Sequence, residues 1–378
     1  MSRIYYTLYD RLLHRKALAE AFACVKRNQG AAGIDGQTIE EFAGNLEAEL
    51  DCLIDELRTK QYEPKPVRRV SIPKAGGGER HLGIPSVRDR VVQQALLSQM
   101  QPIFDPEFHP SSYGYRPGRS CQQAVSKAVQ FMREYERNWC VDLDIRQCFD
   151  SLDHDLILEA VRRRVRDGSV LELIGKYLRS GVMVGGEWQE SEQGSPQGGV
   201  ISPLLSNCYL HLLDRIWDRH QLCWKLKARI VRYADDFVVL CGDKVDAPLA
   251  MVRHVLDRLD LKLNESKTRI VDARKESFNF LGFAIRVSKS WKSGKSYPHV
   301  CPAPKSLAKI KERIKQQTDR RLTPVPLGRG SLPAALQRLA EEEGLEHGIR
   351  IACHCDLGEL RLGPWQADHL FRIARECL

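Results

Sequence analysis

The chain has 378 residues, which is enough for a large hydrophobic core and two or three subdomains. Its formal net charge is +9, and a cationic surface suits a polyanionic partner such as nucleic acid. No apolar run is long enough to cross a membrane, and the first residues, Met1–Tyr6, lack the apolar core of a signal peptide. The 12 cysteines are scattered, so we expect reduced thiols in a cytoplasmic protein without a membrane partner.

The N-terminal part of the chain is predicted to consist mainly of helices. Ser86 and Asp89 have the spacing of a capping box, which predicts the start of a helix that runs to about Met100. A strand is predicted at Val67–Pro73, and the glycine-rich residues Ala75–Gly78 follow it as a flexible tip. The other helices expected here are Leu8–Lys26, Thr38–Arg58 and Ser120–Tyr135.

The central part of the chain alternates predicted strands with predicted helices. Trp139–Ile145 alternates polar and apolar residues as a strand does, and Pro203–Arg219 has the apolar stripe of a helix. Further strands are expected at Thr268–Asp272 and Phe278–Val287, and further helices at Asp155–Arg164, Val170–Leu178, Leu249–Leu259 and the basic segment Lys305–Arg321. An antiparallel sheet backed by helices is an α+β fold.

Two adjacent acids, Asp235 and Asp236, are the most informative feature of the sequence. The segment Tyr233–Asp236 lies between the apolar, β-branched runs Arg229–Arg232 and Phe237–Cys241, a pattern that predicts a strand, a tight turn and a second strand. Like charges at such a turn repel each other, and a divalent cation is the usual compensation. Two magnesium ions about 3.5–4 Å apart are the standard arrangement for phosphoryl transfer. An exposed loop is the competing interpretation.

A third acid, Asp144, favours the metal-site interpretation. It lies near the end of the predicted strand Trp139–Ile145, and in a two-metal polymerase site one strand supplies an aspartate while a neighbouring hairpin supplies the others. Asp142 lies on the same face of that strand and is the alternative candidate. Asp150 and Asp153 are expected to cap turns or the helix that follows.

A series of sequence blocks, in a fixed order from residue 33 to residue 283, resembles the reverse transcriptases of the group II intron type. The blocks are Gly33–Gly36, Ile72–Lys74 with Arg80–Pro85, Asp105–Pro106 with Ser111–Gly118, Val141–His154, Gly194–Leu204, Tyr233–Asp236, Leu263–Asn264 with Lys267, and Phe280–Phe283. An ordered set of this kind is very specific, and on this resemblance the chain is identified as a member of that family.

The resemblance implies a right-hand polymerase architecture, with helical fingers, an antiparallel-sheet palm and a helical thumb that is truncated or atypical. The implied divisions are an N-terminal extension at 1–60, fingers at 61–138, a palm at 139–288 and a thumb or maturase-like region at 289–378, with the reverse transcriptase domain as a whole at about 55–288. After about residue 323 the chain departs from the family, and its tail contains Cys353–Cys355. With Cys377, these residues do not have the spacing of a zinc finger.

The same resemblance assigns a metal site. It implies that Asp144 and Asp235 bind two magnesium ions, together with the backbone carbonyl of Ile145. Asp236 is the third catalytic carboxylate, which either binds metal directly or only adds negative field, and the resemblance favours the weaker role. In such a site one ion lowers the pKa of the primer 3′-hydroxyl, while the other holds the triphosphate.

Five residues are implied to contact the incoming deoxynucleoside triphosphate. Lys74 and Arg80 flank the glycine tip and are expected on the triphosphate, although a solvated basic loop is the competing interpretation. Gln197 is expected to hydrogen-bond the nucleotide, and Lys267 is expected near the leaving pyrophosphate. Phe149 is expected to pack beneath the sugar and exclude a 2′-hydroxyl, with an ordinary core position as the alternative.

Other residues in these blocks have open roles. Tyr113 and Tyr115 are expected either to stack on a base or to pack in the protein. Tyr233 is expected to meet the end of the primer, and Arg68 and Arg69 are expected to contact the template backbone.

The function implied is that of an RNA-directed DNA polymerase of a mobile group II intron. It would extend a DNA or RNA primer on an RNA template, expected to be intron RNA, and would be cytoplasmic and associated with nucleic acid. A residual role in binding or splicing intron RNA is a further expectation, and no endonuclease segment with paired Cys-x-x-C ligands is found. The alternatives are a host-adopted relative in a CRISPR or phage-defence system, and a degenerate element that only binds RNA.

Overall fold

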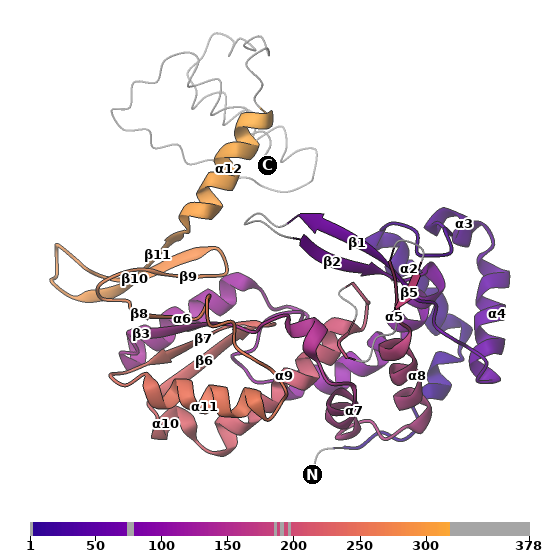
Figure 1. Ribbon diagram of the computed structural model, residues 1–378, viewed down its shortest axis with the longest axis horizontal. Helices are drawn as coiled ribbons and strands as arrows, with labels where there is room; N and C mark the ends of the chain where they lie inside the picture. The colour runs from indigo at the N-terminus through magenta and orange to yellow at the C-terminus, as the bar shows by residue number, and fades with distance from the viewer. Residues whose placement is uncertain (1–2, 74–78, 185–186, 190–192, 196–197, 318–378) are drawn as a thin grey trace, which may run out of the picture. The chain divides into compact units, whose positions relative to one another are not determined.

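The computed structural model describes residues 3–73, 79–184, 187–189, 193–195 and 198–317 (Figure 1). The chain divides into two compact units, Met1–Ser306 and Leu307–Leu378. The described part of the second unit belongs to α12 (Pro304–Gln317), which begins one residue before the basic helix predicted at Lys305–Arg321 and overlaps it. The first unit carries the other described elements, and no described helix is long and apolar enough to span a membrane.

The first predicted helix, Leu8–Lys26, is two helices in the structure. These are α1 (Tyr9–Leu12) and α2 (Arg15–Asn28), separated at His14, which has an extended backbone. Two backbone N–H groups at the start of α1 donate to Asp167 Oδ2, at 2.7 and 2.8 Å. The sequence pattern missed this break because a distant carboxylate tethers the first turn.

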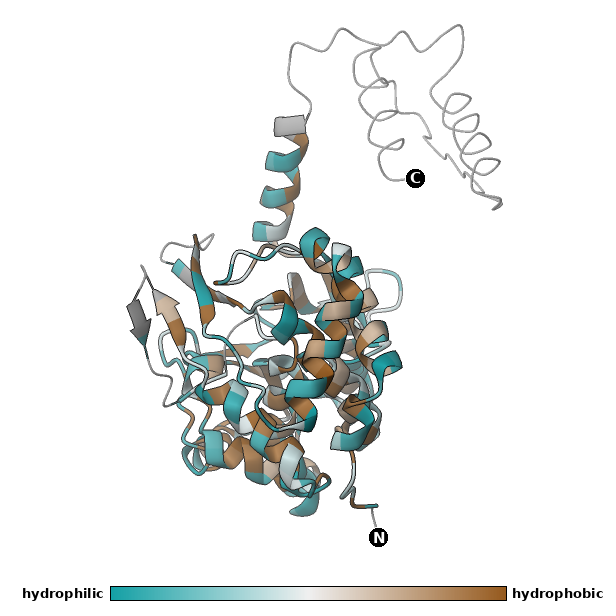
Figure 2. Cartoon of the chain, turned by 90° about the vertical axis from the view of Figure 1, so that its right-hand side faces the viewer, coloured by the Kyte–Doolittle hydropathy of each residue, from teal (hydrophilic) through white to brown (hydrophobic). Residues whose placement is uncertain are grey.

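The second predicted helix, Thr38–Arg58, is also interrupted. It forms α3 (Ile39–Gly44) and α4 (Leu46–Arg58), which are separated at Asn45, directly after a glycine, and both residues are poor helix formers. The buried residues of α4 recur at the three- and four-residue intervals of an amphipathic helix. Figure 2 shows hydrophilic and hydrophobic positions intermixed along the helices of the first unit in this way.

The first sheet has the strand order β2-β1-β4-β5. The predicted strand is confirmed as β1, which pairs antiparallel with β2 and parallel with β4. After β2, the hydroxyl of Ser86 accepts the N–H of Asp89 and caps α5 (Val87–Phe104), which confirms the predicted helix start but extends the helix beyond Met100. The strands are β1 (Val67–Pro73), β2 (Glu79–Ile84), β4 (Val182–Val184) and β5 (Glu187–Gln189), and the short helix η1 (Asp105–Glu107) follows α5.

The central sheet has the strand order β6-β7-β3-β8 and is antiparallel throughout. Its strands are β3 (Trp139–Asp144), β6 (Ala228–Tyr233), β7 (Asp236–Cys241) and β8 (Arg269–Asp272). The helices in this part of the chain are α6 (Cys121–Tyr135), α7 (His154–Arg162), α8 (Gly168–Arg179), α9 (Ser202–Arg219), α10 (Leu222–Lys225) and α11 (Asp246–Asp257), with η2 (Cys148–Ser151) after β3. The mixture of helices with largely antiparallel sheets confirms an α+β fold.

Both faces of the central sheet are buried. Val141 and Leu143 of β3 belong to a large apolar cluster that also contains residues of α7, α9 and α11. Cys140 of β3 and Val238 of β7 belong instead to a second cluster with residues of α6, β9 and β10. Because successive strand residues point to opposite faces, β3 can contribute to both clusters.

The third sheet has the strand order β11-β10-β9. The single strand predicted at Phe278–Val287 is wrong, because Leu281 and Gly282 have φ angles of +51° and +84° and turn the chain. The result is an antiparallel pair, β9 (Phe278–Phe280) and β10 (Phe283–Lys289), to which β11 (Ser296–Pro302) adds a third strand.

Candidate active site

The two adjacent acids lie at a tight turn between β6 and β7, as predicted. Tyr233 and Asp236 are opposite each other in the antiparallel pairing, so the turn itself consists of Ala234 and Asp235. Ala234 has a φ of +58°, in the left-handed region that non-glycine residues rarely adopt. Ala234 is buried, Asp235 is half-buried and Asp236 is exposed. The carboxylates therefore project from a constrained piece of backbone.

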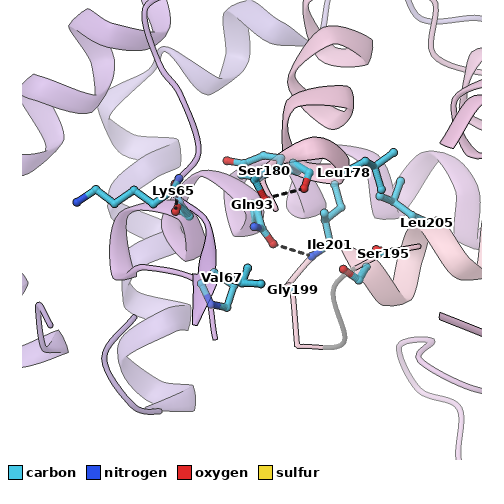
Figure 3. A pocket seen from close by; sticks show the side chains of 13 residues that line it. Lys65, Val67, Gln93, Leu178, Ser180, Ser195, Gly199, Ile201 and Leu205 are labelled. Carbon is cyan, nitrogen blue, oxygen red and sulfur yellow. Dashed lines mark hydrogen bonds between the residues drawn. The ribbon is translucent and has the colours of Figure 1, made fainter. Parts of the chain in front are cut away.

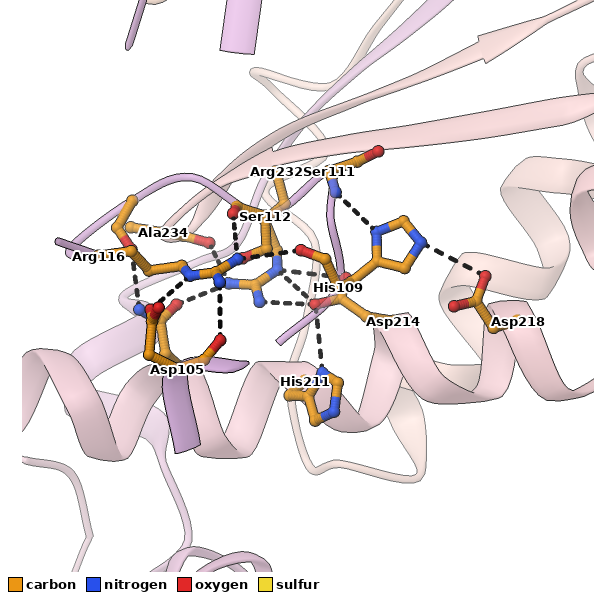
Figure 4. A network of polar contacts seen from close by, with 12 residues as sticks. Asp105, His109, Ser111, Ser112, Arg116, His211, Asp214, Asp218, Arg232 and Ala234 are labelled. Atoms are coloured by element: carbon orange, nitrogen blue, oxygen red, sulfur yellow. Dashed lines mark hydrogen bonds and ion pairs between the residues drawn. The ribbon is translucent and has the colours of Figure 1, made fainter. Parts of the chain in front are cut away.

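A buried arginine holds this turn (Figure 4). Arg232 is 0% exposed and forms an ion pair with Asp214, with Nη2 and Oδ2 2.7 Å apart. Its Nη1 donates to Asn207 Oδ1 at 3.0 Å and to the carbonyl of Ala234 at 3.1 Å. Burial acts to raise the pKa of the Asp214 carboxyl, but the charge of Arg232 and the hydrogen bonds to Asp214 outweigh it, so this pKa is well below its usual range.

The sequence analysis missed this support. Asn207 also donates to the carbonyl of Gly114, at 2.8 Å, and a Cβ atom at Gly114 would lie 2.2 Å from the backbone nitrogen of Ala234. Gly114 therefore allows the two backbones to approach closely. The available signals were the arginine at the end of an apolar strand and Asp214 within a largely apolar helix.

Three acids share one face of the central sheet. Asp144 is directly opposite Asp236 in the β3–β7 pairing, and Asp142 lies two residues earlier on the same strand. Desolvation, followed by the negative charges of Asp235, Asp144 and Asp142, raises the pKa of Asp236 to about 6. Burial also raises the pKa of Asp142 to about 6, although the positive charge of Arg269 opposes that shift. Asp236 is still exposed to solvent, so a cation can reach this cluster of negative charge.

The fold brings the sequence block Leu263–Asn264 with Lys267 next to Asp144. Asp144 Oδ2 accepts hydrogen bonds from Lys267 Nζ at 3.0 Å and from Asn264 Nδ2 at 3.1 Å. The backbone N–H of Asn264 donates to the Asp144 carbonyl, and Ile145 forms a β-bridge with Leu263. The side chain of Lys267 is 64% exposed, so this ion pair adds little stability and leaves the ammonium accessible to a ligand.

Magnesium fits the donors of this cluster. Within the described ranges, no group of three or more His, Cys, Asp or Glu side chains is arranged as a complete metal site. Magnesium is usually held by only one or two carboxylates, with substrate phosphates and water as the remaining ligands. Oxygen atoms of Asp144, Asp235 and Asp236 and the backbone carbonyl of Ile145 are the donors available for it. The pKa of Asp236 is raised partly by the negative charges of the neighbouring carboxylates, and a bound cation would offset that repulsion.

The aromatic residues divide into packed and accessible ones. Phe149 is half-buried, and its ring centroid lies 6.3 Å from that of Tyr115 in an edge-to-face arrangement. Tyr115 is 51% exposed, whereas Tyr113 is buried in the second apolar cluster. Tyr113 therefore packs in the protein, and an ordinary core position does not describe Phe149.

Two of the predicted nucleotide-binding residues, Lys74 and Gln197, lie outside the described residues. Of Arg80 only the backbone is described, opposite Ile72 in the β1–β2 pairing. These three assignments stay predictions. Arg80 lies on β2, a strand that we did not predict from the sequence.

The residues that flank Gln197 are well anchored. Ser195 N donates to the carbonyl of Phe149 at 2.7 Å, and a Cβ atom at Gly198 would lie 2.3 Å from the carbonyl oxygen of Gly83 in β2. Figure 3 shows Gln93 of α5 turned toward Ile201, whose backbone N–H donates to Gln93 Oε1 at 3.4 Å. The segment on both sides of Gln197 is thus attached to Phe149 and to the first sheet.

The glycine block near residue 33 packs against the start of α5. A Cβ atom at Gly33 would lie 2.6 Å from the Cα of Ser86. Arg68 Nη2 donates to the carbonyl of Ala32 at 2.7 Å, and Arg90 Nη2 donates to that of Ala31 at 2.8 Å. Arg68, which we expected on the template, therefore holds the N-terminal segment in this structure.

Comparison with known proteins agrees with this geometry. A family profile described as reverse transcriptase (RNA-dependent DNA polymerase) matches residues 72–285, more than half of the chain. The chain belongs to the reverse transcriptase family.

Curated relatives place it more narrowly. The protein YkfC of Escherichia coli is 37% identical over 304 residues, which cover 71% of this chain and 80% of that protein. The group II intron-encoded protein LtrA of Lactococcus lactis is 30% identical over 357 residues, which cover 77% of this chain but only 58% of LtrA. The nuclear intron maturase 3 of Arabidopsis thaliana is 24% identical over 264 residues, which cover 62% of this chain and 35% of that protein. Group II intron-encoded proteins and intron maturases are thus among its relatives, as the sequence blocks predicted.

Proposed function

We propose that the chain is an RNA-directed DNA polymerase of a mobile group II intron, which extends a primer on an RNA template with deoxynucleoside triphosphates. The observation that carries this proposal is the direct pairing of Asp144 with Asp236, beside Asp235 at the β6–β7 turn. A relative named as a group II intron-encoded protein supports intron RNA as the template. We infer a right-hand layout in which the central sheet is the palm, β1 and β2 with α5 belong to the fingers, and α12 begins the thumb.

The residues of the cluster divide the work of nucleotide transfer. Asp144 and Asp235, with the Ile145 carbonyl, are proposed to hold two magnesium ions, and Asp236 adds negative charge next to them. Bound magnesium would lower the pKa of the primer 3′-hydroxyl and offset charge on the triphosphate. Lys267, held beside Asp144, is positioned to offset charge on the leaving pyrophosphate. Phe149 is proposed to lie beneath the sugar and exclude ribonucleotides.

Primer extension tests the proposal. The full chain is given a DNA primer on an RNA template, magnesium and deoxynucleoside triphosphates, and Asp144→Asn and Asp235→Asn are compared with Asp257→Asn. Asp257 is an exposed residue at the end of α11 and belongs neither to the central sheet nor to the β6–β7 turn. Its variant therefore controls for the loss of a carboxylate. Each cluster variant should extend the primer at least about a hundredfold more slowly. Normal extension by Asp235→Asn would refute the assignment.

A second candidate function is binding or splicing of intron RNA. It is favoured by the exposed cations of α12, namely Lys305, Lys309, Lys311 and Arg313, and by relatives named as intron maturases. An intron-splicing assay on the wild type and Asp235→Asn separates the two functions. Splicing that survives in Asp235→Asn while extension is lost would establish both, and failure of the wild type to bind or splice intron RNA would exclude this second role.

A further inference from the structure

A cavity of about 690 Å³ lies among α7, α9 and the chain that follows α5. It is distinct from the candidate active site, because its lining includes no residue of β3, β6 or β7. Four arginines line it, namely Arg163, Arg164, Arg215 and Arg219. Its volume lies within the range of about 300–1,000 Å³ that is usual for small-molecule sites.

The positive charge of this cavity is only partly compensated. Glu107 pairs with Arg164, and Asp218 lies 3.3 Å from His109 Nε2, so both carboxylates of the lining are already engaged (Figure 4 shows the second pair). Among the described residues, Arg163 and Arg215 have no ion pair. Burial and the positive charge of Arg215 lower the pKa of Arg163. A bound anion would offset the repulsion between the positive charges of Arg163 and Arg215, which have no carboxylate partner in the part of the chain that the structure describes.

The rest of the lining is apolar. Leu212 contributes half-buried aliphatic surface, Phe104 and Phe108 line the cavity with only 4% and 5% of their surface exposed, and the ring of Phe108 lies edge-to-face with that of His211 at 5.5 Å. On a convex surface, water alone would solvate the guanidinium groups. Here the arginines border a hollow with an apolar wall, which a purely ionic ligand such as inorganic phosphate would not fill.

We propose that this cavity binds one nucleotide, with its phosphate on Arg163 and Arg215 and its base against the apolar wall of Phe104, Phe108 and Leu212. Arginine recognises phosphate through several charge-assisted hydrogen bonds, and an aromatic or aliphatic surface accepts any base. Two kinds of ligand would present this phosphate and base to the cavity. It is a free nucleoside triphosphate, or it is one unit of a bound RNA chain.

Binding measured on the full chain without magnesium tests this proposal. Chelation with EDTA suppresses metal-dependent binding at the acidic cluster, so the outcome is independent of the polymerase proposal. The probes are ATP, inorganic triphosphate, a short unstructured RNA and the same RNA with one abasic unit. The variant Arg163→Gln/Arg215→Gln is compared with Arg162→Gln/Arg258→Gln, which removes the same charge from exposed arginines that do not line the cavity.

Loss of the two phosphate contacts should weaken binding at least about tenfold in the cavity variant relative to its charge-matched control. If ATP shows this loss and binds more tightly than inorganic triphosphate, the ligand is a free nucleotide. If only RNA shows the loss, and the abasic unit weakens wild-type binding, the ligand is a unit of the RNA chain. Equal affinities of the two double variants for every probe, or no preference for a base, would overturn the proposal. Circular dichroism confirms that both variants are folded.

Discussion

Replacing Arg232 by methionine should destabilise the protein strongly. The guanidinium is fully buried, and its removal leaves the buried Asp214 carboxylate without its 2.7 Å partner and the carbonyl of Ala234 without a donor. Breaking a buried ion pair from one side costs about 3–5 kcal/mol. Arg253→Met is the control, because Arg253 pairs with Glu265 at the surface, where such a pair is worth about 0–1 kcal/mol.

Urea unfolding at pH 7, followed by circular dichroism, measures these differences. The double variant Arg232→Met/Asp214→Asn removes both charges, so it should recover at least about 2 kcal/mol relative to Arg232→Met alone. A loss below about 1 kcal/mol for Arg232→Met, or a double variant no more stable than the single one, would refute the idea that an uncompensated Asp214 carries the cost.

The pH dependence of the free energy of unfolding provides an independent test. In the wild type the folded pKa of Asp214 is depressed, so its contribution is present above the unfolded pKa of about 3.9 and is lost as pH falls through the folded pKa. Without Arg232, burial raises the pKa of Asp214, and the folded variant then binds a proton more readily than the unfolded chain. The stability difference between wild type and Arg232→Met should therefore narrow as pH falls toward 4. A difference that widens would contradict this account.

Three further substitutions test the site. Gly114→Ala should cost several kcal/mol of unfolding free energy in urea and abolish primer extension, because its Cβ meets the backbone of Ala234; near-wild-type values would show that the close contact is dispensable. Phe149→Val should leave deoxynucleotide incorporation within about tenfold of wild type and raise ribonucleotide incorporation by at least about tenfold; unchanged selectivity would remove the proposed role. Lys267→Met should slow extension about tenfold or more while changing stability by less than about 1 kcal/mol, since its pair with Asp144 is exposed; a purely structural role predicts the reverse.

The local features of the site could be predicted from the sequence. The β6–β7 hairpin follows from two apolar runs around a short polar turn, and the helix caps at Ser86 and Asp153 follow from local side-chain chemistry. The assignment of Asp144 and Asp235 as metal ligands follows from the resemblance.

What depends on long-range pairing could not be predicted. The register that sets Asp144 opposite Asp236 joins strands far apart in the chain, and no local pattern specifies it. Arg232 could be recognised as buried only with its partner Asp214 on α9 in view. The break between α1 and α2 could not be predicted either, because Asp167, which accepts the hydrogen bonds from the start of α1, lies far along the chain.

The burial of both faces of the central sheet also limits how far an expressed fragment can be shortened. The family match ends at residue 285, inside β10, whose full length pairs with β11 as far as Pro302. A fragment cut at the family boundary would keep the β9–β10 pairing but leave the remaining residues of β10, Phe283–Ile285, without β11 as their other neighbour. It would thin the cover over Val238 and Val271, exposing apolar surface and an unpaired strand edge that favour aggregation. Asp144, Asp235 and Asp236 would all be present in such a fragment, but its solubility would depend on the residues beyond 285.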